Sequence, residues 1–477
     1  GFAGGHVQDR MPESYNQGIA LRMHKTGQIP DSLDKYKVIL QKEGVKFSDI
    51  TSTAHAVNQP GEYILFELVH GQPHPFTGGF PYPDLLVQGV ADTFLNATMT
   101  GYEKTLGNEF GKLVPGLFTD EPNINRGVPK DAIRWTPDLF DVFEKTWKYN
   151  LVEHLPSLIE EVGDWKKVRH NYYQTLLQLF IDRWSKPNYE YCEENNLQWT
   201  GHYWEHGWPS PVHGGDNMAM YAWHQTPGID MLFNTRSERP DQFGNNRAAK
   251  ELISVANQMG CARTLSETYG ASGYELNFED MMRNGNWQFA LGVNLMTQHL
   301  SYYSIQGTRK YDFPQTFSYH APFWEHYTVQ NDYFGRLSLA LASGQQLNKI
   351  LVIEPTTSSW MYFSKLGSNK RFDEISNKFD DFIDELEMLH IEYDIGCENM
   401  IKDHGRSENG AFVINKRKYD CVILPPGTDN LNSPTVQVLK HYLEQGGKVI
   451  SFEDEITRVD GAETTGISDL QSKYANQ

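Results

Sequence analysis

The nonapeptide VPGLFTDEP, residues 114–122, joins a short apolar run to two adjacent carboxylates and a proline. Leu117 and Phe118 suit a strand that is buried on both faces, whereas Asp120 and Glu121 are costly to bury unless a partner or a reaction uses them. Because neighbouring residues of a strand point to opposite sides, only one of the two carboxylates can project fully into a site. The stretch therefore predicts a strand whose carboxyl end is a functional site.

The same pattern of a short apolar strand followed by a longer helical segment repeats along the chain. Between residues 84 and 110, apolar side chains recur every three or four positions, which predicts a helix that stops at Gly111. Alternating strands and helices predict a parallel sheet with helical crossovers. The candidate strands are residues 62–69, 114–119, 197–204, 228–233, 262–267 and 293–298.

These strands favour a (β/α)8 barrel of the TIM type, which needs two further strands. We expect the initial GFAGG to follow the second barrel strand and residues 31–41 to form the next helix, so that an N-terminal strand lies upstream of this chain. An open doubly wound sheet is the alternative, because it needs no missing strands. The barrel is favoured because acidic motifs fall at the carboxyl ends of several strands.

The sequence changes character near residue 345. We expect residues 1–344 to form the barrel domain and residues 345–456 to form a smaller α/β domain, without a Gly-rich phosphate loop or paired catalytic groups. This second domain suits a scaffold or an oligomer contact. Residues 457–477 are polar and weakly patterned, which predicts a linker or tail.

Composition limits the classes of partner. The 61 acidic and 42 basic residues give a formal charge of -19, which repels phosphate backbones and disfavours nucleic acid as a partner. The apolar runs are too short to cross a bilayer, so no membrane partner is expected. The chain starts with GFAGG, without an initiator Met or a leader, so we expect a processed product or a piece of a longer protein. The location must be inferred from function, and the function developed below predicts the periplasm or the outside of the cell.

A second acidic strand end has the design of the first. In LSETYGASG, residues 265–273, the end of an apolar strand is followed by Glu267 and then by a loop that contains glycine. Two carboxyl groups that face each other across a cleft are the machinery of glycoside hydrolysis, in which one protonates the leaving oxygen and the other attacks or activates water. Each acid alone could simply cap the following helix, but two such sites on separate strands favour function.

The stretch from 199 to 224 is rich in Trp and His and includes His202, Trp204 and Glu205. Sugar rings stack on indoles and bind charged groups through their hydroxyls, so this mixture suits a glycan pocket. Buried core Trp and His residues are the alternative interpretation. A metal site is conceivable, but the spacing is not diagnostic.

A family resemblance rests on residues 84–122, on TGHYWEHG (200–207), on LSETYGASG and on GVNLMTQHLSYYS (292–304). These stretches resemble glycoside hydrolase family 106, the α-L-rhamnosidases of polysaccharide-degrading bacteria. The expected barrel is also similar to that of family 42 β-galactosidases, in which a flavodoxin-like trimerisation domain follows. The resemblance therefore implies a flavodoxin-like second domain here, with oligomer contacts.

The same resemblance implies residue roles. In that superfamily the acid ends the fourth strand and its partner ends the seventh, which makes Glu121 the proton donor and Glu267 the second carboxylate. The superfamily has Asn before the acid where this chain has Asp120, and family 106 implies inversion and a calcium ion with Asp120 or Glu205 as an oxygen ligand. The expected substrate-binding residues are Asp120, His202, Trp204, Glu205, Tyr269, Asn294 and His299.

The resulting hypothesis is an exo-acting hydrolase of oligo- or polysaccharides, with an α-L-rhamnoside as the leading substrate. The alternatives are a β-galactosidase-like or other exo-glycosidase, and a non-catalytic barrel that only binds glycans. The presence of both carboxylates speaks against the non-catalytic barrel.

Overall fold

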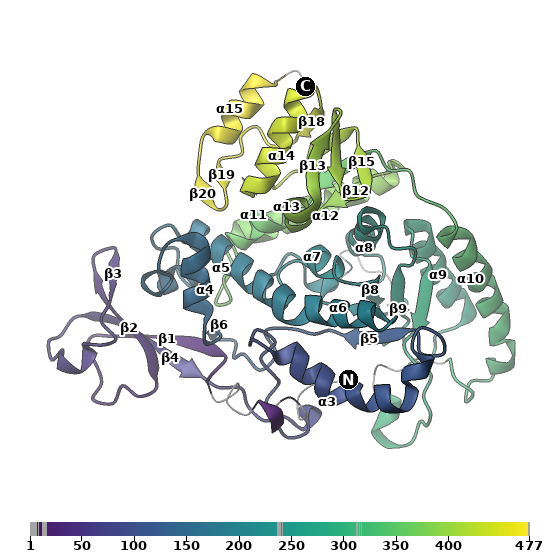
Figure 1. Cartoon of the computed structure of the whole chain (residues 1–477), viewed down its shortest axis with the longest axis horizontal. Helices are drawn as coiled ribbons and strands as arrows, with labels where there is room; N and C mark the ends of the chain where they lie inside the picture. The colour runs from purple at the N-terminus through teal and green to yellow at the C-terminus, as the bar shows by residue number, and fades with distance from the viewer. Residues whose placement is uncertain are drawn as a thin grey trace.

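The computed structural model describes residues 7, 9–11, 17–235, 240, 242–311, 313, 315 and 317–475. An antiparallel sheet projects at one end of the molecule, a parallel sheet with its helices occupies the middle, and a second α/β unit lies above it (Figure 1). The predicted position of GFAGG lies outside the described residues.

The N-terminal sheet corrects two predictions. Its strands are antiparallel, in the order β3-β2-β4-β1-β6. Residues 31–41 do not form a helix but lead into β2, and residues 62–69 form β4 of this sheet, not a strand of the barrel. Their bounds are β1 (Ala20–Thr26), β2 (Tyr36–Glu43), β3 (Lys46–Asp49), β4 (Glu62–Val69) and β6 (Ala132–Arg134).

The physical reason is the period of burial in β2. Val38 and Leu40 pack into the main core, whereas Ile39 between them packs on the other side of the sheet with Tyr63 and Leu65. Alternate residues on opposite faces are the two-residue period of a strand. The three consecutive buried aliphatic residues of β2 are therefore explained by a strand in a sheet that is covered on both faces, and not by a helix.

The central sheet confirms the other five predicted strands. They are parallel and lie in the order β10-β9-β8-β7-β5, curled as half of a barrel. The two strands with the acidic ends, β5 and β9, are separated by β7 and β8. The bounds are β5 (Gly116–Asp120), β7 (Gln198–His202), β8 (Thr226–Met231), β9 (Leu265–Thr268) and β10 (Leu295–Gln298).

Close strand packing explains Gly201 in β7. Its φ is +123°, and a Cβ atom there would lie 1.9 Å from the carbonyl oxygen of Thr119 in β5. Only glycine tolerates this backbone and this approach. Gly201 therefore lets β5 and β7 pair up to the residues at their carboxyl ends.

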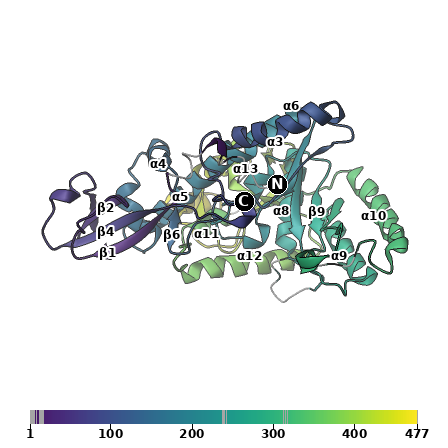
Figure 2. The same ribbon diagram turned by 90° about the horizontal axis from the view of Figure 1, so that it is seen from below.

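Helices connect these strands, and the helix predicted between 84 and 110 is present as α3, although it ends at Leu106 and not at the predicted Gly111. Figure 2 shows α3 beside α6 on one side of the sheet, while α8, α9 and α10 follow one another on the other side. The bounds are α3 (Val90–Leu106), α4 (Leu139–Trp147), α5 (Trp165–Phe180), α6 (Lys186–Glu194), α7 (Asn217–Tyr221), α8 (Asn246–Met259), α9 (Phe278–Leu291) and α10 (Tyr327–Ala342).

The second unit is built from strands and helices around a parallel sheet. Its parallel sheet has the order β12-β11-β16-β18. A hairpin sheet of β13 (Gly405–Glu408), β14 (Ala411–Ile414) and β15 (Arg417–Tyr419) flanks it. The main elements are β11 (Ile350–Ile353), α11 (Thr356–Trp360), α12 (Lys370–Met388), β12 (Asp394–Gly396), α13 (Glu398–His404), β16 (Cys421–Leu424), α14 (Ser433–Glu444) and β18 (Lys448–Ser451).

The expected tail contains secondary structure. The strands β19 (Arg458–Val459) and β20 (Ala462–Glu463) pair with each other, and β19 also pairs with β17 (Asn430–Leu431). They precede α15 (Gly466–Lys473), whose Ile467 is buried in the core of the second unit. Ile467, together with the partly buried Val459, thus anchors a segment whose composition is polar.

The two units share one core. The largest hydrophobic cluster includes Ile229 and Leu252 beside the central sheet and also Val352, Phe379 and Ile395 of the second unit. The domain boundary near residue 345 stays a prediction, and the shared core means that a cut there exposes apolar surface.

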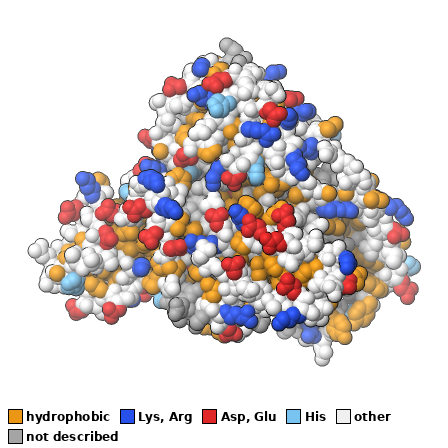
Figure 3. All heavy atoms as spheres, in the orientation of Figure 1, with side chains coloured by type: hydrophobic (Ala, Val, Ile, Leu, Met, Phe, Trp, Pro, Cys, Tyr) orange, Lys and Arg blue, Asp and Glu red, His pale blue; other side chains and the backbone are white. Residues whose placement is uncertain are grey.

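The described helices are all too short or too polar to cross a membrane. Acidic side chains gather near the middle of the face seen in Figure 3. On α6, the side chains of Glu190, Glu193 and Glu194 are exposed. This surface agrees with the acidic composition.

Candidate active site

Acidic residues and one histidine meet at the carboxyl edge of the central sheet. In the strand register, Asp120 of β5 lies opposite His202 of β7, and Asp230 of β8 lies opposite Glu267 of β9. Glu121 directly follows β5. The carboxyl ends of parallel strands thus bring the two predicted catalytic carboxylates to one edge.

His202 is the centre of the cluster. Its side chain is 1% exposed, and Nε2 lies 2.7 Å from Oε2 of Glu267 and 4.0 Å from Oδ1 of Asp120. Burial by itself lowers the pKa of His202, but the hydrogen bond with Glu267 and the charges of nearby acids outweigh burial and raise it to about 10. At neutral pH His202 is therefore an imidazolium that donates a hydrogen bond to the Glu267 carboxylate.

Glu121 has a backbone and an environment that differ from those of Glu267. Its φ is +45°, and its N–H still donates to the carbonyl oxygen of His202 at 3.2 Å. Burial raises the pKa of Glu121 to about 7, with the charge of His202 opposing and the charge of Asp120 reinforcing the shift. A carboxyl group that is half protonated near neutrality can act as a proton donor.

Asp230 belongs to the cluster and was missed by sequence reasoning. It is 7% exposed, and its Oδ1 has no hydrogen-bond partner among the described residues. Side-chain ligand atoms of Asp230, Glu121 and His202 lie within 4.8 Å of one another. Burial raises the pKa of Asp230 well above its usual range. The missed signal was an acid within the otherwise apolar strand GIDMLF (228–233).

Glu205 is not placed to bind substrate, which corrects the prediction for this residue. It is fully buried, its Oε1 accepts the Asp230 N–H at 2.5 Å, and its Oε2 accepts the Tyr221 hydroxyl at 3.0 Å. Both carboxylate oxygens are therefore engaged in the core beneath the site, where Glu205 supports Asp230.

The implied calcium site does not fit the predicted ligands. Glu205 is fully buried, and each of its carboxylate oxygens already accepts a hydrogen bond. Asp120 has a side chain that is 70% exposed and could reach an ion. It offers at most two oxygens, however, and Ca²⁺ takes about six to eight oxygen ligands. The neighbouring cluster adds an imidazole whose Nε2 already pairs with Glu267.

Tyr269 and Asn294 are likewise not brought into the cluster. Tyr269 is fully buried, and its hydroxyl donates to the carbonyl oxygen of Met281, so it packs the loop after β9. Asn294 precedes β10, at the amino edge of the sheet, where its side chain caps the Thr264 N–H. Burial keeps Tyr269 from contacting a substrate at the catalytic edge. Asn294 cannot reach such a substrate because it lies at the opposite, amino edge of the sheet.

His299 and Trp204 lie on loops at the correct edge. His299 directly follows β10, is partly buried, and has an Nδ1 atom without a partner among the described residues. Trp204 follows β7, is partly exposed, and stacks on His213 with ring centroids 4.1 Å apart. Their contact with substrate stays a prediction.

Tyr82 and Arg126 form a further part of the site that the sequence did not indicate. The Arg126 guanidinium lies 5.6 Å from the centre of the Tyr82 ring. The charge of Arg126 lowers the pKa of Glu121, opposing burial, while burial raises the pKa of Tyr82 to about 12. Tyr82 is distant in sequence from every acidic motif, so only the fold could reveal it.

A curled parallel sheet with carboxyl groups gathered at its carboxyl edge is the fold and site chemistry of barrel-type glycoside hydrolases. The family model described as alpha-L-rhamnosidase, glycoside hydrolase family 106, matches residues 84–470. The chain belongs to this family. Comparison with curated protein sequences gives no match.

Solved structures support the same fold. The chain is similar to a rhamnosidase from Novosphingobium sp. PP1Y, with a TM-score of 0.66 and 18% identity over 90% of this chain and 41% of that one. It is also similar to a β-galactosidase from the haloarchaeon Halorubrum lacusprofundi, with a TM-score of 0.56 and 9% identity over 80% and 59% of the two chains. The chain is similar as well to a β-galactosidase from Marinomonas ef1, with a TM-score of 0.54 and 9% identity over 80% of this chain and 61% of that one. The chain thus spans less than half of the solved rhamnosidase.

Proposed function

We propose that this protein is an exo-acting glycoside hydrolase that removes terminal α-L-rhamnosyl groups from oligo- or polysaccharides. The family membership supports the rhamnoside. The observation that carries the proposal is the contrast between Glu121, with its pKa raised to about 7, and Glu267, hydrogen-bonded to an imidazolium at 2.7 Å. One carboxyl group that holds a proton near neutrality and a second that accepts a hydrogen bond from an imidazolium suit acid and base roles.

In the proposed reaction, Glu121 donates its proton to the glycosidic oxygen as the bond from this oxygen to the anomeric carbon breaks. Glu267 accepts a proton from a water molecule, whose oxygen bonds to the anomeric carbon. His202 orients Glu267, because one Nε2–H bond fixes the position of the carboxylate. Asp120, with its largely exposed side chain, is available to accept a hydrogen bond from a sugar hydroxyl.

We further propose inversion of the anomeric configuration. The Asp120 position and the family resemblance favour a gap of roughly 6.5 to 9.5 Å between the catalytic carboxyl groups, which admits a water molecule. NMR of the first-formed product anomer tests this assignment. A product that initially keeps the configuration of the substrate would make Glu267 a nucleophile.

We also propose that the central sheet is part of a complete (β/α)8 barrel. Among the described strands, β5 pairs only with β7 and β10 only with β9, so both edges are open. Phe118 of β5 is 38% exposed beside His202, although the inner face of a barrel is normally filled by side chains. A longer polypeptide that includes upstream sequence should then melt at a higher temperature than residues 1–477. Equal melting temperatures would contradict this closure.

The decisive experiment is a panel of aryl glycosides. The protein should release the aryl group from the α-L-rhamnoside much faster than from the β-D-galactoside, and it should release only monosaccharide from rhamnosylated polysaccharide. Preference for the galactoside would favour the alternative exo-glycosidase. Absence of activity on every glycoside, with glycan binding retained, would favour the non-catalytic barrel. Location in the periplasm or outside the cell, and oligomer contacts through the second unit, are proposals that follow from this function.

A further inference from the structure

A buried chain of polar contacts leads from the active site into the second unit. It starts at Glu205, whose carboxylate holds the backbone N–H of Asp230 at 2.5 Å. The carbonyl oxygen of Glu205 in turn accepts a hydrogen bond from Nη2 of Arg247 at 2.8 Å. Arg247 lies on α8 and is 3% exposed, so this contact with the Glu205 carbonyl is buried.

Arg247 is held in place from two sides. Its Nη1 donates to Glu251 one turn further along α8, and its Nε lies 3.3 Å from Asp380 of α12. The guanidinium also stacks over the Trp208 ring, 4.7 Å from its centre. The orientation of Arg247 thus depends on Glu251 and Trp208.

Both of these contacts lead to Glu354, at the end of β11 in the second unit. The carboxyl groups of Glu251 and Glu354 are buried neighbours, and Oε2 of Glu251 and Oε1 of Glu354 have no donor partner among the described residues. Burial, and next the charge of Glu251, raise the pKa of Glu354 well above its usual range, which favours one proton shared between the two carboxyl groups. The other oxygen of Glu354 accepts the Thr356 hydroxyl at 2.6 Å, and Thr356 accepts the Trp208 indole N–H at 3.0 Å.

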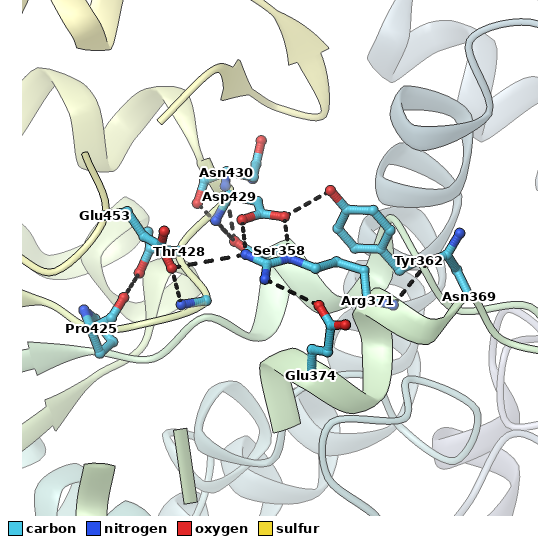
Figure 4. Close-up of polar contacts among 11 residues, drawn as sticks. Ser358, Tyr362, Asn369, Arg371, Glu374, Pro425, Thr428, Asp429, Asn430 and Glu453 are labelled. Atoms are coloured by element: carbon cyan, nitrogen blue, oxygen red, sulfur yellow. Dashed lines mark hydrogen bonds and ion pairs between the residues drawn. The ribbon is translucent and has the colours of Figure 1, made fainter. Parts of the chain in front are cut away.

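A second network fixes the short helix α11, which carries Thr356. Ser358 of α11 accepts the N–H groups of Asp429 and Asn430 at 3.0 and 2.9 Å. Figure 4 shows Asp429 between the Arg371 guanidinium and the Tyr362 hydroxyl. The second unit therefore presents Glu354 and Thr356 from a rigid support.

From this ring of contacts we propose that Glu354 is a positioning residue for the active site, acting through Glu251, Arg247 and Glu205 on the main chain of Asp230. The second unit is then part of the catalytic apparatus, beyond a scaffold or an oligomer contact. Without Glu354, the Glu251 carboxylate loses its partner and draws Arg247 away from the Glu205 carbonyl. Because Glu354 is only 3% exposed, its loss should change kcat more than KM.

The test compares Glu354→Ala with Glu354→Gln in the full chain. The Gln side chain reproduces the protonated acid, because its amide donates to Glu251 and its oxygen accepts from Thr356. Glu354→Ala should lower kcat on an aryl α-L-rhamnoside by about 10-fold with little change in KM, since small displacements of catalytic groups cost rate. Glu354→Gln should restore most of the wild-type kcat.

Asp394→Ala is the matched control. Asp394 is also a fully buried carboxylate of the second unit that contacts α8, through Asn257 at 2.8 Å, but it lies at the start of β12, away from the catalytic edge. This variant should lose thermal stability and keep kcat. If Glu354→Ala lowers kcat no more than Asp394→Ala does, the proposal is overturned.

A readout independent of catalysis is the backbone amide proton of Asp230 in an NMR spectrum. Its resonance should move upfield in Glu354→Ala as the bond to Glu205 lengthens, and it should stay in place in Asp394→Ala. Arg247→Lys, which keeps the charge but loses the forked donor, should reproduce the shift if Glu354→Ala does not fold. An unmoved Asp230 resonance in the variants that fold rejects the positioning role.

The activity arm rests on the proposed function, and the two can fail separately. A wild-type protein without rhamnosidase activity would reject the proposed function, while the amide shift would still decide the positioning role. An active wild type with an unaffected Glu354→Ala variant would reject the positioning role alone.

Discussion

The two parallel sheets of the molecule both gather acids at their carboxyl edges, but they treat these acids differently. At the edge of the second sheet, Asp429 accepts from Arg371 Nε at 3.0 Å and from Tyr362 at 2.7 Å, and Glu453 accepts the Gly427 N–H at 2.6 Å. Asp429 also accepts from Nη2 of Arg371, so its carboxylate has three side-chain donors. This edge is built for stability.

At the edge of the central sheet, the acids outnumber the donors. The three acids Glu121, Asp230 and Glu267 surround a single imidazolium, that of His202. Oδ1 of Asp230 has no hydrogen-bond partner among the described residues. The pKa of Glu121 rises to about 7 as a result of burial that no cation fully compensates. The comparison teaches that strand-end geometry collects acids at both edges, whereas perturbed acids beside the 70% exposed Asp120 side chain mark the edge that a substrate can reach.

Glu267→Gln should produce the largest effect at the catalytic edge. The amide cannot accept a proton from water, so kcat/KM should fall by about 1,000-fold on polysaccharide and aryl rhamnoside alike. Steady-state kinetics on both substrates check this expectation. A loss confined to the polysaccharide would assign Glu267 to substrate binding.

Glu121→Gln should show a smaller loss that depends on the leaving group. The loss should be on the order of 100-fold or more on natural linkages and much less on an aryl rhamnoside, whose leaving group needs little protonation. Kinetics on the matched pair of substrates measure the contrast. Equal losses on both would count against an acid role.

The pH dependence should sharpen the contrast further. Because the pKa of Glu121 is raised to about 7, the active protonated form is lost above this pH, and kcat/KM should decline through an alkaline limb near pH 7. Stability should fall as pH rises from the ordinary Glu value to about 7, since the unfolded chain releases this proton first. Glu121→Gln should remove this contribution and the alkaline limb, which pH-rate profiles and thermal melts at several pH values can show.

Asp429→Asn at the second edge should have the smallest effect on catalysis. It weakens the pairing with Arg371 and should lower the free energy of unfolding by about 1–3 kcal/mol, while kcat stays unchanged because the Asp429 N–H still holds Ser358. Denaturant unfolding and kinetics measure the two quantities.

Asp230→Asn at the edge of the central sheet should have the opposite effects, with little loss of stability and a lower kcat.

Local sequence patterns determined much of the central sheet. The apolar run before Asp120 and Glu121 predicted β5, and the same design before Glu267 predicted β9, because a parallel strand buried on both faces needs a continuous apolar segment. The amphipathic period before Gly111 predicted α3 for an equally local reason. Two acids at two strand ends were therefore visible without coordinates.

Contacts between distant segments decided the rest. Residues 31–41 became the strand β2 because Val38 and Ile39 meet apolar layers on opposite faces, and neither layer is encoded nearby. Tyr269 and Glu205 carry polar groups that suit a sugar, yet both are consumed by partners in the core. Asp230 entered the site because β8 lies between β7 and β9. The sequence by itself determined which strand ends are acidic, and only the tertiary structure decided which acids remain unpaired, because pairing depends on donors that folding brings from elsewhere in the chain.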